Sequence, residues 1–139
     1  MDDCIFCKII KGELPSAVIY EDDALIAFLD LFPVSRGHAL LVPKKHYRNI
    51  FDADMETAAL IYPTLSRLAN AIRAATGCEG LNIIQNNEAV AMQMVFHSHV
   101  HLIPRYADDN IKLAVAGKQQ ASGDQLAEMA GKIKGAIIL

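Results

Sequence analysis

Apolar and polar positions in the first third of the chain predict a short helix followed by three strands. Apolar residues recur at helical spacing over residues 4–12, and this segment ends at a glycine. Val18–Glu21 and Ala24–Leu29 are rich in β-forming residues and flank two aspartates, which predicts a hairpin. The nearly continuous apolar run His38–Pro43 predicts a third strand that lies centrally in a sheet and ends at its proline.

The rest of the chain predicts a long helix, two more strands and a C-terminal helix. Ile61–Ile72 carries apolar residues on one helix face, and Pro63 should kink or divide that helix. Leu81–Gln85 and Val95–Ile103 are the fourth and fifth strand candidates, and Asp124 can cap a final helix. Strands joined by hairpins beside segregated helices indicate an α+β domain with a five-stranded, mostly antiparallel sheet.

Length and composition indicate one globular domain. The chain has 139 residues, which fits a single domain, and its 53% hydrophobic content excludes a disordered chain. We expect residues 1–110 to form the domain. Residues 111–139 should form a loop and a helix that pack on the domain or on a dimer partner, because the apolar end of the chain needs a cover.

Charge and the N-terminus exclude several classes of partner. The net charge of −3 argues against nucleic-acid binding, which needs a basic face. No apolar run approaches the ~18 residues of a membrane helix, so no membrane partner is expected. The acidic N-terminus is unlike a signal peptide, and three cysteines, an odd number, indicate reduced thiols or metal ligands. These features predict a cytoplasmic location.

Three of the five histidines alternate along one segment, His97-Ser98-His99-Val100-His101. On a strand, this alternation would place all three rings on the same face. A row of groups that titrate near neutral pH indicates a functional surface. Three chemistries fit such a row: a metal site, nucleophilic catalysis by a neutral imidazole, or phosphate binding without turnover. The spacing alone does not decide among them.

The segment His97–Ile103 resembles the signature of the histidine triad (HIT) family, which reads His-φ-His-φ-His-φ-φ with φ apolar. Further segments resemble the Hint-like branch of that family in order and spacing: Ile5–Ile10, Ala27–Asp30, Gly37–His46 and Asn86-Asn87. The resemblance implies a HIT-like fold and a homodimer in which two five-stranded sheets join into one of ten strands.

The resemblance also implies an activity. Family members hydrolyse or transfer nucleotides at the α-phosphorus through a covalent nucleotidyl-histidine. Purine nucleoside phosphoramidates or dinucleoside polyphosphates would be the substrates, and catalysis would need no metal. By this likeness His99 is the nucleophile and the backbone carbonyl of His97 fixes its tautomer. His101 would contact the phosphate or the leaving group, and His38 would support the triad from a neighbouring strand.

A nucleoside pocket follows from the same resemblance. Asp30 matches the residue that accepts hydrogen bonds from the ribose hydroxyls. Asn86 matches a polar residue near the phosphates, and Gln93 matches the glutamine of the loop that enters the triad segment. The apolar slot around the base would be formed by Ile5, Phe6, Ile9, Phe28 and Leu31.

The chain departs from the family pattern beside this glutamine. The family usually reads Gly-Gln-Ser/Thr, whereas the chain reads Met92-Gln93-Met94. Methionine disfavours the positive φ that glycine permits, and a thioether cannot donate a hydrogen bond to a phosphate oxygen. Losing one donor to a charged oxygen costs roughly 1.5–3 kcal/mol. We therefore expect an altered substrate or rate within the same family.

A second motif, Cys4-x-x-Cys7, indicates a structural metal site by resemblance. In some bacterial members of the family, two such cysteines bind zinc together with two histidines. The matching histidines are His46 and His97. Two thiolates and two imidazoles suit tetrahedral zinc.

Three other functions stay open at this point. A nucleotide-binding adaptor with weak or no catalysis is favoured by Met92 and Met94. A metal-dependent hydrolase would use the histidine triad as metal ligands. Thiol redox chemistry would use Cys4 and Cys7 and would not need His99.

Overall fold

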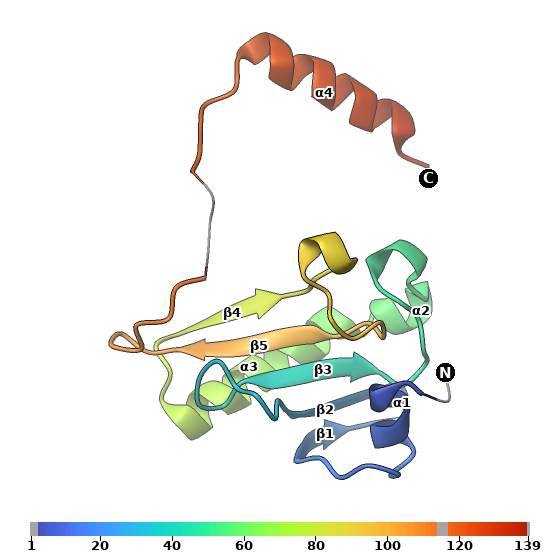
Figure 1. The fold of residues 1–139 in the computed structure, drawn as a ribbon, viewed down its shortest axis with the longest axis vertical. Helices are drawn as coiled ribbons and strands as arrows, with labels where there is room; N and C mark the ends of the chain where they lie inside the picture. Colours follow the sequence, from blue (N-terminus) through green and yellow to red (C-terminus); the bar gives the residue numbers. More distant parts are fainter. Residues whose placement is uncertain (1–2, 114–116, 139) are drawn as a thin grey trace.

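The computed structural model describes residues 3–113 and 117–138 and contains one five-stranded sheet (Figure 1). The strands lie in the order β1-β2-β3-β5-β4, and each neighbouring pair is antiparallel. Their bounds are β1 (Val18–Glu21), β2 (Leu25–Leu29), β3 (Ala39–Pro43), β4 (Gly80–Ile84) and β5 (Val100–Arg105). The predicted α+β fold with an antiparallel sheet is confirmed.

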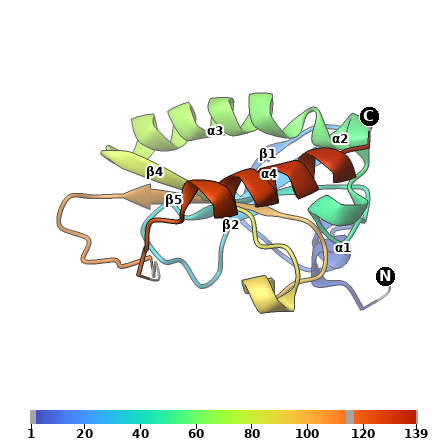
Figure 2. The ribbon, with the colours of Figure 1, turned by 90° about the horizontal axis from the view of Figure 1, so that it is seen from above.

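Helices lie on both faces of the sheet (Figure 2). The long helix α3 covers one face, while α1 lies on the opposite side. The helical elements are α1 (Ile5–Ile10), α2 (Met55–Ala58), α3 (Ile61–Thr76), α4 (Gly123–Ala136) and two short 3-10 turns, η1 (Ile50–Asp52) and η2 (Ala89–Ala91).

Alternation along the central strands builds a separate apolar core on each face. Leu41 of β3 packs with Leu65, Leu68 and Ile72 of α3. On the other face Phe6 of α1 packs among the side chains Ile26, Phe28, Leu40 and Val42. Successive residues along each of these strands, β2 and β3, thus enter opposite cores. Both strands therefore consist of apolar residues.

The helical segment after Asp54 is divided, but the break lies between α2 and α3, before Pro63, so the predicted Ile61–Ile72 face stays within one helix. Asp54 caps α2 by accepting a hydrogen bond from the backbone N–H of Thr57. A new helix, α3, then begins at Ile61, so Pro63 lies in its first turn, where a missing N–H costs little. The helix ends at Gly77, which has a left-handed φ of 68°.

The fifth strand begins later than predicted. The pattern indicated a strand over Val95–Ile103, but β5 starts at Val100. The preceding segment is held by other contacts: the N–H of Ser98 donates to the carbonyl of Tyr47 at 2.8 Å, and His97 bonds to the carbonyl of Pro43. Of the three alternating histidines, only His101 therefore lies on a strand.

The C-terminal helix is capped by Ser122, so the predicted cap at Asp124 is wrong. The Ser122 hydroxyl accepts from the N–H of Gln125 at 3.1 Å, and the Gln125 side chain accepts from the N–H of Ser122 at 3.0 Å. Asp124 instead lies in the first helical turn, where its charge complements the helix dipole.

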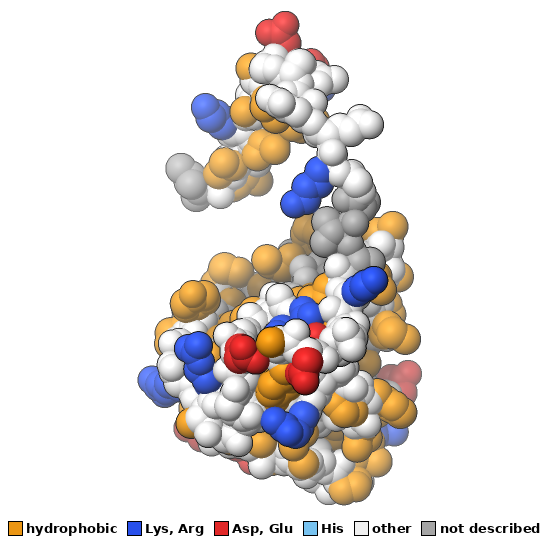
Figure 3. Space-filling model, turned by 90° about the vertical axis from the view of Figure 1, so that its left-hand side faces the viewer, with side chains coloured by type: hydrophobic (Ala, Val, Ile, Leu, Met, Phe, Trp, Pro, Cys, Tyr) orange, Lys and Arg blue, Asp and Glu red, His pale blue; other side chains and the backbone are white. Residues whose placement is uncertain are grey.

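Helix α4 lies apart from the domain (Figures 1 and 3). None of its residues is buried within the part of the chain that the structure describes. Its apolar side chains, Leu126, Met129 and Ile133, are each more than half exposed. The packing predicted for residues 111–139, on the domain or on a dimer partner, stays a prediction, and Leu139 lies outside the described residues. No helix among residues 3–113 and 117–138 combines the length and the apolar content required to cross a membrane.

Candidate functional site

His99 is a buried imidazole with one ring nitrogen held and the other available. Its Nδ1 lies 2.7 Å from the carbonyl oxygen of His97. A carbonyl can only accept, so Nδ1 carries the proton and Nε2 of the neutral ring keeps its lone pair. Burial lowers the pKa of His99, and this effect outweighs the carbonyl of His97 and the charge of Asp30, which raise it. The ring is therefore neutral and nucleophilic at neutral pH.

His38 and His101 form a second pair of imidazoles beside His99. Nε2 of His38 lies 2.9 Å from Nδ1 of His101, and the rings of His101 and His99 meet edge to face at 5.1 Å. Burial is the main cause that lowers the pKa of His101 to about 4, and burial also lowers the pKa of His38. An oxygen of Asp30 lies 3.5 Å from Nε2 of His38. These neutral rings and one carboxylate form the polar part of the site.

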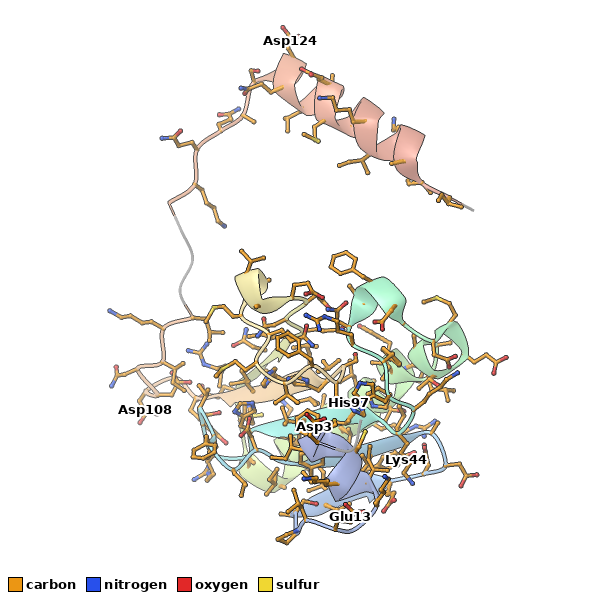
Figure 4. The ribbon with its side chains drawn as sticks, turned by 45° about the vertical axis from the view of Figure 1, so that its right-hand side comes forward. Asp3, Glu13, Lys44, His97, Asp108 and Asp124 are labelled. Carbon is orange, nitrogen blue, oxygen red and sulfur yellow. The ribbon has the colours of Figure 1, made fainter. Side chains whose placement is uncertain are left out.

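The ring of His97 belongs to a different cluster, with Cys4, Cys7 and His46. In Figure 4, His97 lies where α1 meets the sheet. Its Nδ1 is 3.4 Å from Sγ of Cys4 and 3.6 Å from Sγ of Cys7, and Nδ1 of His46 is 3.4 Å from Sγ of Cys7. The prediction that three rings share one face thus needs correction, because His97 precedes β5 and its ring turns toward α1.

The donor set of this cluster fits zinc. One ligand atom from each of the four residues lies within 4.8 Å of the others. Nε2 of His97 donates to the carbonyl of Pro43 at 2.7 Å, so Nδ1 of the neutral ring has its lone pair directed at the cysteines. Two thiolates and two imidazoles complete a tetrahedral shell without an open position, which is typical of a structural site. Burial and the neighbouring Cys4 raise the pKa of the Cys7 thiol, and a bound cation would oppose that rise.

The residues predicted for the nucleoside pocket fall into two groups. Phe6 and Phe28 are buried, with their rings 5.6 Å apart, and Phe6 also meets the ring of His99 edge to face at 5.1 Å. Ile9 packs against the same core, whereas Ile5 and Leu31 are exposed. The ring of Phe6 therefore lies against the nucleophile, and Phe28 packs against Phe6. Their contact with a base stays a prediction.

Two of the predicted polar contacts, Asp30 and Asn86, are partly exposed. One oxygen of Asp30 accepts from the N–H of Phe32 at 2.9 Å, which fixes the carboxylate just after β2. The amide of Asn86 is 3.4 Å from the carbonyl of Met92 and so lies against the loop before the triad segment. Both side chains retain polar atoms for a ligand.

Gln93, in contrast, has a buried side chain whose polar atoms bond to the protein, and its contact with substrate stays a prediction. Its oxygen accepts from Asn49 at 3.0 Å and from the N–H of Glu88 at 2.8 Å. Its amide donates to the carbonyls of Arg48 at 2.8 Å and Val95 at 3.0 Å. These four bonds use the hydrogen-bonding capacity of the amide, so Gln93 fixes the loop in this structure.

Sequence reasoning missed the partners that hold this loop. Asn49 is 1% exposed and bonds to both Gln93 and Glu88. Arg48 forms a bidentate pair with Glu88 at 2.7 and 2.8 Å, across 40 residues of sequence. Glu88 has a φ of 79°, a strained backbone that these contacts stabilise. No local signal in the sequence identifies this network.

The two unusual methionines of the loop are exposed, and one has the backbone that glycine favours. Met92 has a φ of 73°, and its side chain is 77% exposed. Met94 is 88% exposed and is not among the residues with positive φ. The expected conflict between methionine and a left-handed position is therefore present at Met92.

A cavity of about 340 Å³ has none of these histidines in its lining. Its lining comes from the loop after β2 and the segment after β5: Val34, Ser35, Arg36, Tyr106, Asp108, Asp109 and Ile111. It contains none of the predicted site residues. The histidine cluster therefore remains the candidate site.

Comparison with known proteins shows what the chain resembles. The family model described as "HIT domain" matches residues 11–108. An adenylylsulfatase from Arabidopsis thaliana is 43% identical over 108 residues, which cover 78% of this chain and 55% of that relative. An adenosine 5'-monophosphoramidase from Schizosaccharomyces pombe is 42% identical over 102 residues, 73% of this chain and 74% of that relative.

Solved structures share the fold, and one of them contains zinc. A HIT family protein from Bacillus subtilis has a TM-score of 0.93 at 37% identity, covering 99% of both chains. A zinc-bound histidine triad family protein from Mycobacterium smegmatis has a TM-score of 0.77 at 34% identity, covering 98% of this chain and 99% of the other.

Proposed function

The chain belongs to the HIT domain family, and on that premise we propose that it is a nucleotide hydrolase or transferase with His99 as its nucleophile. The proposed substrates are purine nucleoside phosphoramidates or dinucleoside polyphosphates. The names of the two enzymatic relatives support adenosine nucleotides as the substrate class. The observation that carries the proposal is the bond from Nδ1–H of His99 to the carbonyl of His97, which leaves Nε2 free.

The proposed reaction has two displacements at phosphorus. Nε2 of His99 attacks the α-phosphorus, a nitrogen–phosphorus bond forms, and the bond from phosphorus to the amine or phosphate leaving group breaks. Water then attacks phosphorus and gives up a proton to solvent, the bond to His99 breaks, and the nucleoside monophosphate is released. This proton balances the one that the leaving group takes up from solvent in the first displacement. The carbonyl of His97 stabilises the positive charge that the substituted ring of His99 carries between the two steps.

Neighbouring groups orient the substrate in this proposal. His101 contacts a phosphoryl oxygen or the leaving atom, because its ring lies 5.1 Å from that of His99. Asp30 accepts from the ribose hydroxyls, and Asn86 lies near the phosphates. The base stacks against the apolar residues around α1 and β2, namely Ile5, Phe6, Ile9, Phe28 and Leu31.

Zinc would be held by Cys4, Cys7, His46 and His97, and we propose that it is structural. When bound, the cation would join α1 to the segment before β5. The zinc-bound relative and the donor set support this assignment. No step of the reaction involves the metal, because the attacking group is a side chain.

We also propose that the chain forms a homodimer. Its support is helix α4, whose apolar side chains are exposed and face back toward the domain in Figure 3. Exposed apolar surface of this kind marks an interaction site. Sedimentation of the full chain tests the dimer: Leu126→Asp with Ile133→Asp should give a monomer, while Lys132→Asp on the polar face should not. A wild-type monomer would contradict it.

The second candidate is a nucleotide-binding adaptor without turnover. It is favoured by Met92 and Met94, which place thioethers where the family usually has glycine and a hydroxyl donor. Comparison of the wild type with His99→Ala separates the two functions. Both proteins should bind adenosine monophosphate alike, and the variant should lose at least about 10³-fold in cleavage of an adenosine phosphoramidate. If neither protein cleaves it, the adaptor is correct.

A further inference from the structure

We propose that the backbone N–H of Val34 fixes the proton positions of His38 and His101, so that His101 can only donate a hydrogen bond to the substrate. The inference rests on the proposed function, because it assigns a role to His101 within that site. It identifies the turn that precedes β3 as a positioning element for the reaction. It also excludes His101 as the base that activates water.

The first step concerns His38. The N–H of Val34 points at Nδ1 of His38, with a nitrogen–nitrogen distance of 3.0 Å. A backbone N–H can only donate, so Nδ1 must offer a lone pair. A neutral imidazole has one protonated nitrogen, and its proton is therefore on Nε2 of His38. The charged form, with both nitrogens protonated, would lose the bond to Val34.

The second step passes this constraint to His101. Nε2 of His38 lies 2.9 Å from Nδ1 of His101, and its proton makes Nδ1 the acceptor. The proton of neutral His101 is then on Nε2, the nitrogen that remains for a ligand. Asp30, at 3.5 Å, offers a second and weaker acceptor to Nε2 of His38 and favours the same proton position.

The turn that carries Val34 is fixed by bonds that do not involve the histidine rings. The hydroxyl of Ser35 donates to the carbonyl of Pro104 at 2.6 Å, and the N–H of His38 donates to the carbonyl of Ser35 at 3.1 Å. Gly37 has a φ of 90°, and a side chain there would lie 2.9 Å from a methyl group of Thr76. The N–H of Val34 is thus held in place by β5 and α3. Its position does not depend on the His38 ring, so it determines which nitrogen of His38 carries the proton.

The same proton positions argue against a metal at this pair. Asp30, His38 and His101 have ligand atoms close enough for one cation. A metal bound through Nε2 of His38 would need the lone pair of that atom, but the bond from Val34 places a proton there. The arrangement therefore fits a hydrogen-bond chain and not a second metal centre.

The functional consequence is a difference between Nε2 of His99 and Nε2 of His101, the two ring nitrogens that the proposal assigns to the substrate. Nε2 of His99 offers a lone pair to phosphorus, while Nε2–H of His101 offers a donor to the adjacent oxygen or leaving atom. Such a preorganised donor is worth most where charge develops in the transition state. The water of the second displacement must lose its proton to another acceptor.

Proton positions can be measured directly by long-range ¹H–¹⁵N NMR on protein with labelled histidine, at pH 7.5. We expect Nε2–H for His38 and His101 and Nδ1–H for His99, with the signals assigned from single His→Gln variants. Observation of Nδ1–H on His38 or His101, or of a lone pair on Nε2 of His101, would overturn the proposal. The spectrum does not depend on turnover, so it is separate from the test of the nucleophile.

Matched variants test the source of the constraint. Val34→Ala keeps the backbone N–H and should leave the spectrum unchanged, whereas Val34→Pro removes the N–H and should populate Nδ1–H on His38. His38→Gln retains a donor to His101 and should keep the Nε2–H form, while His38→Leu should give a mixture. We expect kcat to fall about tenfold or more in His38→Leu, with KM changed less, and to recover in His38→Gln.

These variants remain informative if one of them does not fold. Should Val34→Pro unfold, His38→Gln and His38→Leu still distinguish a side chain that donates a hydrogen bond from one that only fills space. Glutamine and leucine have similar volumes, so the comparison isolates the hydrogen bond. Equal activity and equal His101 spectra in His38→Leu and the wild type would overturn the proposal. Loss of cleavage in His99→Ala tests the proposed function alone.

Discussion

Nδ1 of His99 lies 2.7 Å from the carbonyl oxygen of His97, and the ring of His97 is directed at Cys4 and Cys7. One residue therefore takes part in two sites through different atoms. Its carbonyl orients the nucleophile, and its Nδ1 completes the donor set of the metal cluster. This relationship connects the stability of the cluster to the orientation of His99.

Removal of the metal should lower stability more than it lowers the rate of the chemical step. A chelator should lower the free energy of unfolding by roughly 2–4 kcal/mol, because zinc binds the folded cluster and has no equivalent site in the unfolded chain. Thermal unfolding and metal analysis, with one zinc per chain expected, check this in the wild type and in Cys7→Ser. Loss of all turnover on chelation with no change in the melting temperature would instead favour the metal-dependent hydrolase.

The pH dependence of cleavage should follow the neutral form of His99. Burial lowers the pKa of His99 below its ordinary value of 6.5, and the ring is inactive when protonated. As the pH falls, kcat/KM should therefore decline, and it should reach half of its maximum below pH 6.5. The ring of His101, with a pKa of about 4, stays uncharged over most of this range. A half-maximal kcat/KM at pH 6.5 or higher would be the opposite result.

Met92→Gly should stabilise the protein. Met92 has a φ of 73°, and a non-glycine residue in the left-handed region costs of order 1–3 kcal/mol. Glycine removes that cost but adds chain entropy to the unfolded state, so a net gain of about 1 kcal/mol is expected in urea unfolding. Met94→Gly is the matched control, because Met94 is equally exposed but lacks a positive φ, and it should give no gain.

Gln93→Ala should mainly lower the free energy of unfolding. The substitution leaves Asn49 and the backbone groups of Glu88, Arg48 and Val95 without their bonds to the Gln93 amide. Each buried polar group left unpaired costs about 1–3 kcal/mol, so we expect a loss of at least about 2 kcal/mol in urea unfolding. A large rise in KM with stability unchanged would show that Gln93 contacts substrate after all.

The sequence allowed most of the sheet to be predicted, because alternation and hairpin spacing are local. Val18–Glu21 was predicted with its observed bounds, and the predicted Ile61–Ile72 face lies within α3. The start of β5 was not predictable in the same way. Val95 and Phe96 have high β propensity, yet their segment is held by Tyr47 and Pro43, which are distant in sequence.

The candidate site could also be predicted only in part, because local motifs identify residues but not the contacts between distant segments. The histidine motif indicated the rings of His99 and His101, but it placed the ring of His97 on the same face. The direction of the His97 ring followed only from the family resemblance of Cys4-x-x-Cys7, because it depends on α1, which is distant in sequence. The network of Arg48, Asn49 and Glu88 joins residues about 40 positions apart. The cap at Ser122, in contrast, had a local signal, a serine followed three residues later by glutamine.

The central claim is that His99 forms a transient bond to phosphorus. Its most direct test is to mix the protein with an adenosine phosphoramidate, quench in mild alkali, and analyse the intact chain and its peptides by mass spectrometry. An adenylyl adduct on His99, absent from His99→Ala, is the predicted result. An adduct on another residue, or cleavage at the wild-type rate by His99→Ala, would contradict the account.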